Sequence, residues 1–190
     1  MVICIRWPPF LFAVTLFIYY MSITHKNEYG CLMAMVNPTY GPHIIRMNKT
    51  AIPSDILYID PEDPTYGYDE EPHVTIKYGF SPDLTRMDLA NVLRNVRPFK
   101  IKLTGIGQFQ NEKYDVVKFN VDRSDDLTRL REMCDGYKNE DKYPDYKPHM
   151  TLAYVKKGTF PQVDRKLNIE LPITRFKYSG MNGKNLYINL

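Results

Sequence analysis

The sequence has few cysteines and none of the spacings that bind metal ions. Of its 190 residues only three are Cys, at positions 4, 31 and 134, and no CxxC, HxD or HExxH pattern occurs. Widely spaced thiols in odd number predict free cysteines in a reducing compartment rather than a disulfide framework or a zinc site. We therefore expect no metal and no cofactor, and we expect Cys31 and Cys134 to be buried as small apolar side chains.

Charge of one sign and long hydrophobic runs are also scarce. The formal net charge is only +3, so a polyanion partner would need local clusters of Lys and Arg, and no duplex nucleic acid is expected as a partner. The composition, 44% hydrophobic and 25% charged, is that of a globular protein. Aromatic residues, in contrast, are frequent: 15 are Tyr, and their rings offer surfaces on which nucleobases stack.

The main apolar run at the N-terminus is too short to cross a membrane. It covers residues 10–20, whereas a bilayer span needs about 20 residues, and prolines at positions 8 and 9 prevent its extension as a regular helix. Three interpretations are open for residues 1–20: an extension added by an upstream start codon, a membrane-interface anchor, or a signal peptide. We favour the first, because Met21 begins a stretch of ordinary soluble character, and we expect no membrane partner unless the segment is an anchor.

A heptapeptide occurs twice in the chain and organises the rest. Residues 72–78 read PHVTIKY and residues 148–154 read PHMTLAY, and both copies are typical of strands. In each copy a His and a Thr stand two residues apart, so the imidazole and the hydroxyl project from the same face of the strand. The four candidate catalytic residues are His73, Thr75, His149 and Thr151.

The segments around the heptapeptides form an imperfect internal repeat. Apolar runs predict strands at 31–36, 99–109, 114–121 and 176–179, and near 185–190. Helices are expected at 42–50, after a Ser81 N-cap, and after a Ser124 N-cap. Residues 31–104 and 114–178 thus show a similar order of elements. The repeat predicts a single α+β domain over residues 21–190, with two pseudo-symmetric lobes, about 28–110 and 111–190, around a central cleft.

Two histidines in one cleft suit the chemistry of a phosphodiester. An imidazole titrates near neutral pH, so one neutral ring can take a proton from an attacking hydroxyl while a protonated ring gives one to the leaving oxygen. The two Thr hydroxyls can hydrogen-bond the non-bridging phosphate oxygens.

Four further residues are candidates for substrate binding. Regular strand alternation places Lys77 on the face of His73 and Thr75, where its ammonium would neutralise phosphate. Phe109 is a candidate for base stacking, and Lys142 and Tyr143 lie in the loop that enters the second heptapeptide. The same alternation sends the tyrosines that end both heptapeptides to the opposite face, as packing residues.

The doubled His-x-Thr motif resembles that of the two-histidine (2H) phosphoesterase superfamily. The stretches YGCLMAMVN, LYIDPEDPTYGYDEEPHVTIKYG and KPHMTLAYV look like those of the bacteriophage anti-CBASS nucleases in particular. The resemblance implies a bilobal fold with antiparallel sheet, and it makes the His and Thr residues of the motif a catalytic quartet. It also implies a metal-independent phosphodiesterase that cleaves the 3′-5′ linkages of cyclic di- or trinucleotides in the cytoplasm of an infected bacterium, and so blocks CBASS immunity.

Three other functions stay open. The first is processing of linear RNA ends that carry a 2′,3′-cyclic phosphate, as in other branches of the superfamily. The second is a metal-dependent phosphodiesterase that combines the histidines with carboxylates of the acidic loop. The third is a binding module that sequesters a cyclic nucleotide without cleaving it.

Overall fold

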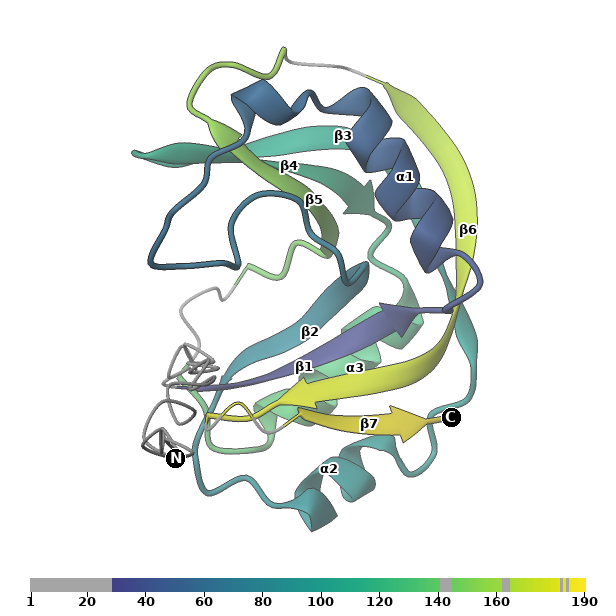
Figure 1. Cartoon of the computed structure of the whole chain (residues 1–190). Coiled ribbons are helices and arrows are strands. Elements are labelled where there is room, and N and C mark those ends of the chain that lie inside the picture. The colour runs from purple at the N-terminus through teal and green to yellow at the C-terminus, as the bar shows by residue number, and fades with distance from the viewer. Residues whose placement is uncertain (1–28, 141–144, 162–164, 182, 184) are drawn as a thin grey trace, which may run out of the picture.

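One antiparallel sheet of seven strands, with helices against it, makes up the molecule (Figure 1). The structure is a computed structural model and describes residues 29–140, 145–161, 165–181, 183 and 185–190. The elements in chain order are β1 (Gly30–Val36), α1 (Gly41–Ala51), the 3₁₀ helix η1 (Ser54–Ile56), β2 (His73–Phe80), α2 (Arg86–Leu93), β3 (Phe99–Gln110), β4 (Tyr114–Val121), α3 (Asp125–Asp135), β5 (His149–Lys156), β6 (Lys166–Ser179) and β7 (Asn185–Asn189).

The sheet folds over so that its two outermost strands meet. Its order is β2-β1-β6-β3-β4-β5, with β7 also paired to β6. The long strand β6 joins two half-sheets, because its C-terminal part pairs with β1 and its N-terminal part pairs with β3. Although β2 and β5 stand at opposite ends of this order, they contact each other across the interior of the fold. Both heptapeptides therefore lie on strands that face one cleft.

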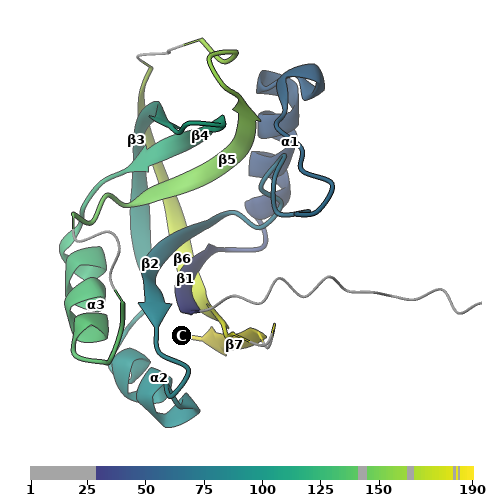
Figure 2. The same cartoon turned by 90° about the vertical axis from the view of Figure 1, so that its left-hand side faces the viewer.

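The two halves of the chain exchange elements. Helix α1, from the first half, packs near β5, whereas α3, from the second half, packs against β2 and α2. Figure 2 shows α1 on one side of the molecule and α2 and α3 on the other. The proposed lobes of residues 28–110 and 111–190 thus each supply a helix to the motif strand of the other. The predicted α+β fold of antiparallel sheet and helices is confirmed.

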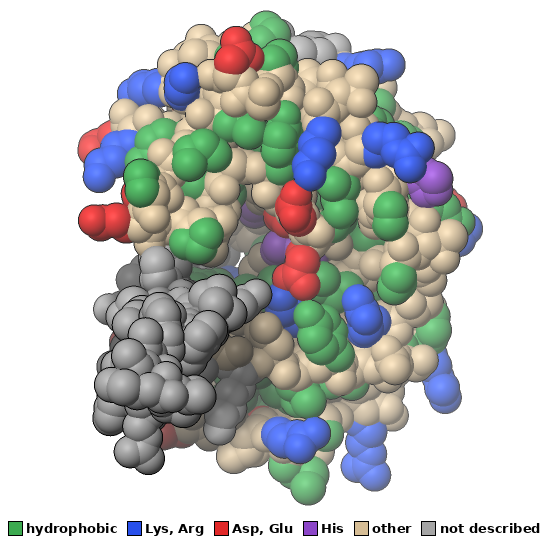
Figure 3. Space-filling view, viewed as in Figure 1, with side chains coloured by type: hydrophobic (Ala, Val, Ile, Leu, Met, Phe, Trp, Pro, Cys, Tyr) green, Lys and Arg blue, Asp and Glu red, His purple; other side chains and the backbone are tan. Residues whose placement is uncertain are grey.

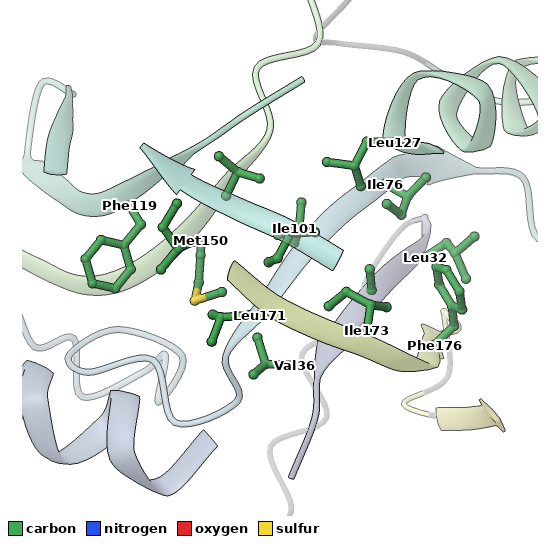
Figure 4. Close-up of a cluster of buried hydrophobic side chains, with 14 of the residues drawn as sticks. Leu32, Val36, Ile76, Ile101, Phe119, Leu127, Met150, Leu171, Ile173 and Phe176 are labelled. Atoms are coloured by element: carbon green, nitrogen blue, oxygen red, sulfur yellow. The ribbon is translucent and has the colours of Figure 1, made fainter. Parts of the chain in front are cut away.

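One continuous core lies between the sheet and the helices (Figure 4). Leu32 and Phe176 come from one half-sheet and Phe119 and Met150 from the other, and Ile101 lies between them. All five side chains are at most 2% exposed. Burial of this apolar surface stabilises the contact between the halves and therefore the geometry of the cleft.

The helix starts agree only in part with the prediction. Ser124 caps α3 as expected, since its hydroxyl accepts a hydrogen bond from Leu127 N. The predicted cap at Ser81 is wrong, because α2 begins later. Thr85 is its N-cap and forms a reciprocal capping box with Asp88, which satisfies two backbone N–H groups where Ser81 would satisfy one.

A β-bulge interrupts the first motif strand. In β2, Thr75 pairs with Met33 of β1, and Lys77 pairs with the next residue of β1, Leu32. Ile76 therefore has no partner. The extra residue ends the regular alternation of side chains, so Lys77 lies on the core face with Leu32.

The second motif strand carries the same bulge. In β5, Thr151 pairs with Lys118 of β4, and Ala153 pairs with Val117, so Leu152 is the extra residue. Both bulges stand three residues after the motif His. The tyrosines Tyr78 and Tyr154 consequently lie on the His/Thr face. Their predicted place on the opposite face is wrong, because that prediction assumed unbroken alternation.

The N-terminal prediction is not covered by the structure. Residues 1–20 lie outside the described residues. None of the helices in the described ranges is long and apolar enough to span a bilayer.

Candidate active site

The four motif side chains project into the space between the half-sheets. His73, Thr75, His149 and Thr151 are all partly buried, whereas their neighbours Val74 and Met150 point into the core. In the space-filling view of Figure 3, His side chains are visible in a hollow near the centre of this face, beside acidic side chains. A hydrogen bond of 3.2 Å from the Tyr146 hydroxyl to the carbonyl of Thr75 ties the approach to β5 to strand β2.

The two histidines are held in the same way. His73 Nδ1 lies 2.6 Å from the carbonyl oxygen of Glu71, and His149 Nδ1 lies 2.8 Å from that of Lys147. A carbonyl oxygen only accepts hydrogen bonds, so Nδ1 carries a proton in both rings. Nε2 is then the atom that takes or gives a proton, and the repeated local structure prepares both rings for acid–base work.

His73 has carboxylates beside it. Asp69 Oδ2 lies 3.7 Å from His73 Nδ1, and Glu71 stands two residues before the ring. Burial raises the pKa of Asp69 above its usual range, and the charge of His73 acts against this rise. Burial also opposes ionisation of Glu71, but its bond to Lys177 holds the pKa of Glu71 below its usual range. His73 therefore has two acidic neighbours, one of which is bound to Lys177.

His149 stands among cations instead. Burial lowers the pKa of His149, and the charges of Lys118 and His73 lower it further, although the hydrogen bond to the Lys147 carbonyl acts in the opposite direction. The ring also meets the edge of Phe109, with centroids 4.8 Å apart. The pseudo-symmetric histidines therefore differ in charge environment, and His149 is the one that stays neutral at lower pH.

The cysteine nearest the site is not a nucleophile. Cys31 pairs with Tyr78 across β1 and β2 and shares a hydrogen bond with the Thr75 side chain. Burial raises its pKa to about 12, so the reactive thiolate is suppressed at neutral pH. Cys134 is fully buried, as predicted, whereas Cys31 is only partly buried; both are free thiols.

Lys77 is not in the cleft, which corrects the sequence prediction. Its side chain is 1% exposed and its ammonium lies 2.6 Å from the Asp135 carboxylate of α3. The bulge at Ile76 turns it toward the helix. The predicted phosphate-binding role of Lys77 is therefore wrong.

Phe109, the candidate for base stacking, lies beside His149, with two polar neighbours that the sequence analysis missed. Lys118 and Asn120 of β4 pair with Thr151 and His149 of β5 and so share their face. The Lys118 ammonium lies 4.3 Å from the centroid of the Phe109 ring and donates a short hydrogen bond to Asn120 Oδ1. The signal was present, because Lys and Asn stand two residues apart in a strand that is otherwise largely apolar.

Four tyrosines form a second feature of the same face. Each of the rings has a neighbour in the group at 5.0 Å or 5.5 Å between centroids, and the members are Tyr58, Tyr66, Tyr114 and Tyr154. We call them the tyrosine cluster. A hydrogen bond with Tyr114 raises the pKa of Tyr66. Burial, then the charge of Asp69, raises the pKa of Tyr154 to about 12.

The acidic loop between η1 and β2 is hydrogen-bonded to the edge of β5. Tyr58 N donates to the carbonyl of Tyr154 at 3.0 Å, Tyr154 N donates to that of Gly67 at 2.8 Å, and Asp69 N donates to that of Leu152 at 3.0 Å. These bonds place Asp69 and two tyrosines at the cleft. The loop thus lies along one side of the cleft.

Two predicted residues, Lys142 and Tyr143, lie outside the described residues. Within the described ranges no three side chains of His, Cys, Asp or Glu are grouped closely enough to hold a metal ion.

Comparison with known proteins gives one family match and several similar folds. A family model described as the 2′-5′ RNA ligase superfamily matches residues 59–179. The TT0787 protein of Thermus thermophilus is similar with a TM-score of 0.56 and 19% identity, over 85% of this chain and 94% of that chain. E. coli LigT complexed with 3′-AMP is similar with a TM-score of 0.55 and 15% identity, over 86% of this chain and 95% of that chain. Usb1 of Kluyveromyces marxianus is similar with a TM-score of 0.59 and 8% identity, over 87% of this chain and 99% of that chain. No curated protein matches the chain.

Proposed function

Because the chain belongs to the 2′-5′ RNA ligase superfamily of 2H phosphoesterases, we propose that it is a phosphodiesterase that opens cyclic di- and trinucleotides at 3′-5′ linkages without a metal ion. One observation carries this proposal. Two His/Thr pairs, on strands from opposite ends of the sheet order, face one cleft, and each imidazole is held through Nδ1 by a backbone carbonyl so that Nε2 is the atom for proton exchange.

The proposed reaction uses both imidazoles once. Neutral His149 takes the proton of a ribose 2′-hydroxyl through Nε2, and the 2′-oxygen attacks phosphorus. The bond from phosphorus to the 5′-oxygen breaks, and protonated His73 gives its Nε2 proton to that oxygen. The ring opens into a linear nucleotide with a 5′-hydroxyl and a 2′,3′-cyclic phosphate. The two histidines have then exchanged protonation states, which readies them for hydrolysis of the cyclic phosphate with their roles reversed.

The charges around the rings support this division of roles. The base must be unprotonated before the reaction, and cationic Lys118 together with burial disfavours a proton on His149. The role of the acid then falls to His73, whose Nδ1 lies 3.7 Å from the Asp69 carboxyl group. Thr75 and Thr151 then hydrogen-bond the non-bridging oxygens and hold phosphorus in line between the rings.

The aromatic side chains around the cleft favour a substrate with nucleobases. Phe109 stands next to His149, and the tyrosine cluster adjoins Asp69 on the other side. Such rings stack on bases of any identity. Together with the resemblance of three stretches to bacteriophage anti-CBASS nucleases, this supports a cyclic oligonucleotide signal as substrate and a role in blocking CBASS immunity in the cytoplasm of an infected bacterium.

A second candidate function is the processing of RNA ends that carry a 2′,3′-cyclic phosphate. The fold similarity to Usb1 and to LigT, which was solved with 3′-AMP, favours it. The same two histidines would then hydrolyse a cyclic phosphate that is already formed. A cyclic-nucleotide sponge without catalysis is the third possibility that an experiment must separate.

The fate of the ligand tests the proposal. Purified protein is incubated with a 3′,3′-cyclic dinucleotide in excess chelator, and the products are separated by chromatography. The proposal expects a linear product with wild type and intact ring with the His73→Ala, His149→Ala double variant. Binding of the ring by both proteins without any change to it would identify a sponge. Loss of wild-type turnover on chelation, with recovery on addition of metal, would sink the metal-free mechanism.

A further inference from the structure

Lys118 is a buried cation on the catalytic face. It is 8% exposed, and it pairs across the sheet with Thr151, one of the proposed phosphate ligands. Its immediate contacts are the carboxamide oxygen of Asn120 and the face of Phe109. An amide dipole and a ring quadrupole each stabilise an ammonium, but neither neutralises its charge.

No carboxylate balances this charge in the part of the chain that the structure describes. The ion pairs there engage other lysines, such as Lys77 with Asp135 and Lys177 with Glu71, and leave Lys118 without an acidic partner. Burial and the charge of Lys147 lower the pKa of Lys118. A desolvated ammonium without a counter-charge is costly, so this position favours an incoming anion.

The neighbouring strand is built to leave room for the lysine. Gly107 and Gly105 of β3 stand opposite Lys118 and Asn120 of β4. A Cβ atom at Gly107 would lie 3.1 Å from Asn120 Oδ1 and 3.4 Å from Lys118 Nζ. Glycine weakens a strand interior, so two of them at this place indicate that a close approach is needed here.

The strand next to Thr75 has no equivalent cation. Where Lys118 pairs with Thr151, Met33 pairs with Thr75. Likewise, Met35 pairs with His73 at the position that corresponds to Asn120. The cations of that half-sheet, Lys177 and Arg175, stand one strand further away on β6, opposite Met33 and Met35, and Lys177 is bound to Glu71.

We propose that Lys118 binds the non-bridging oxygens of the scissile phosphodiester next to Thr151, with Asn120 and Gly107 as residues that position its ammonium. The inference rests on the proposed phosphodiesterase function but names a residue that neither the motif nor the family match supplies. The groups that face Lys118 are Asn120 on its own strand, Phe109 of β3, Thr151 and His149 of β5, and Lys147 before β5. Its charge acts on His149 as well, so one residue binds phosphate and helps to keep the base unprotonated.

Lys118→Met tests the inference, because methionine keeps much of the side-chain shape and is the residue found at the corresponding place of the other half-sheet. Lys102→Met, an exposed lysine on β3, is the matched control. We expect Lys118→Met to weaken inhibition by inorganic phosphate and to lower kcat/KM by about 10- to 100-fold, as loss of a charged hydrogen bond does. The acid limb of the pH profile should move to higher pH, since His149 loses a cationic neighbour; a purely structural role would not move it.

Phosphate binding measured by calorimetry or ³¹P NMR separates this inference from the proposed function. If wild type leaves cyclic dinucleotides intact while Lys118→Met loses phosphate affinity, the substrate is wrong and the role of Lys118 stands. If wild type cleaves them and Lys118→Met binds phosphate and reacts like wild type, the inference is overturned and the function stands. Gly107→Ala keeps the lysine but crowds it, so this variant should also weaken phosphate binding. If Lys118→Met does not fold, unchanged phosphate affinity in Gly107→Ala overturns the inference.

Discussion

At the scale of single residues, the two histidines share one local structure but not one environment. Each Nδ1 faces the carbonyl two residues upstream, as their common heptapeptide dictates. Their surroundings differ because Asp69 comes from a loop and Lys118 from a neighbouring strand. The sequence could therefore identify the pair, but it could not tell the base from the acid. Lys118 is distant from His149 in the chain, and the position of Asp69, although it is only four residues from His73, depends on how its loop packs against β5.

Replacing either histidine should remove turnover and leave the fold intact. His73→Ala and His149→Ala should each lower kcat by about 10²- to 10⁴-fold, the usual contribution of a general acid or base. His43→Ala, on the exposed side of α1, is the matched control and should react like wild type. Equal rates in all three variants, measured by single-turnover assays on folded protein, would remove the histidines from the mechanism.

The pH dependence of the rate should be bell-shaped, and the midpoint of its acid limb should lie at a lower pH than that of an ordinary imidazole. Activity appears as the base loses its proton, and burial with nearby cations lowers the pKa of His149, so the acid midpoint should fall below about 6.5, the value of an ordinary imidazole. The alkaline limb should report loss of the proton from the acid, which is proposed to be His73. Measurement of kcat/KM between acid and alkaline pH checks both limbs. A rate that rises steadily with pH would argue against paired imidazoles.

At the scale of elements, the two β-bulges decide which side chains enter the cleft. Ile76 and Leu152 are extra residues at the same place in both motif strands. They send Lys77 into the core and bring Tyr154 to the catalytic face. Alternation predicts the faces of His and Thr, which come before the bulge, and fails for every residue after it.

Lys77 and Asp135 should form a structural ion pair that has no role in catalysis. Lys77→Met replaces a buried ammonium with an apolar chain and should keep activity and thermal stability near those of wild type. Asp135→Ala instead removes the carboxylate from a lysine that is 1% exposed, and should lower the free energy of unfolding by about 1–3 kcal/mol. Chemical unfolding and steady-state rates measure both. A large loss of activity in the folded Lys77→Met variant would show that Lys77 contributes to catalysis or substrate binding.

The tyrosine cluster should affect substrate binding more than chemistry. Tyr66 comes from the acidic loop and packs on Tyr154 and Tyr114. Tyr66→Ala should raise KM for a cyclic dinucleotide about tenfold, within the range of one stacked base, and leave kcat almost unchanged. Tyr40→Ala, at an exposed ring beside α1, is the control. A fall in kcat with unchanged KM would show that the cluster supports the histidines and does not contact bases.

At the scale of the whole molecule, the sequence predicted most elements and the pairing of motifs, but not how the halves interlock. Strands β1 and β4 and the cap of α3 lie where periodicity placed them. The N-terminal part of β6 was missed, because it is exposed and polar and lacks a strand pattern. The exchange of α1 and α3 between half-sheets is a tertiary arrangement that no local signal encodes.

The central claim is that the facing His/Thr pairs open cyclic nucleotides, and a substrate panel tests it most directly. Wild type and the His73→Ala, His149→Ala variant are given 3′,3′-cyclic dinucleotides, a cyclic trinucleotide and a linear RNA with a 2′,3′-cyclic end, and the products are identified by mass. We predict that wild type converts the rings into linear products that carry a 2′,3′-cyclic phosphate, faster than it hydrolyses the RNA end, and that the variant converts neither. Intact rings together with rapid hydrolysis of the RNA end would contradict the account.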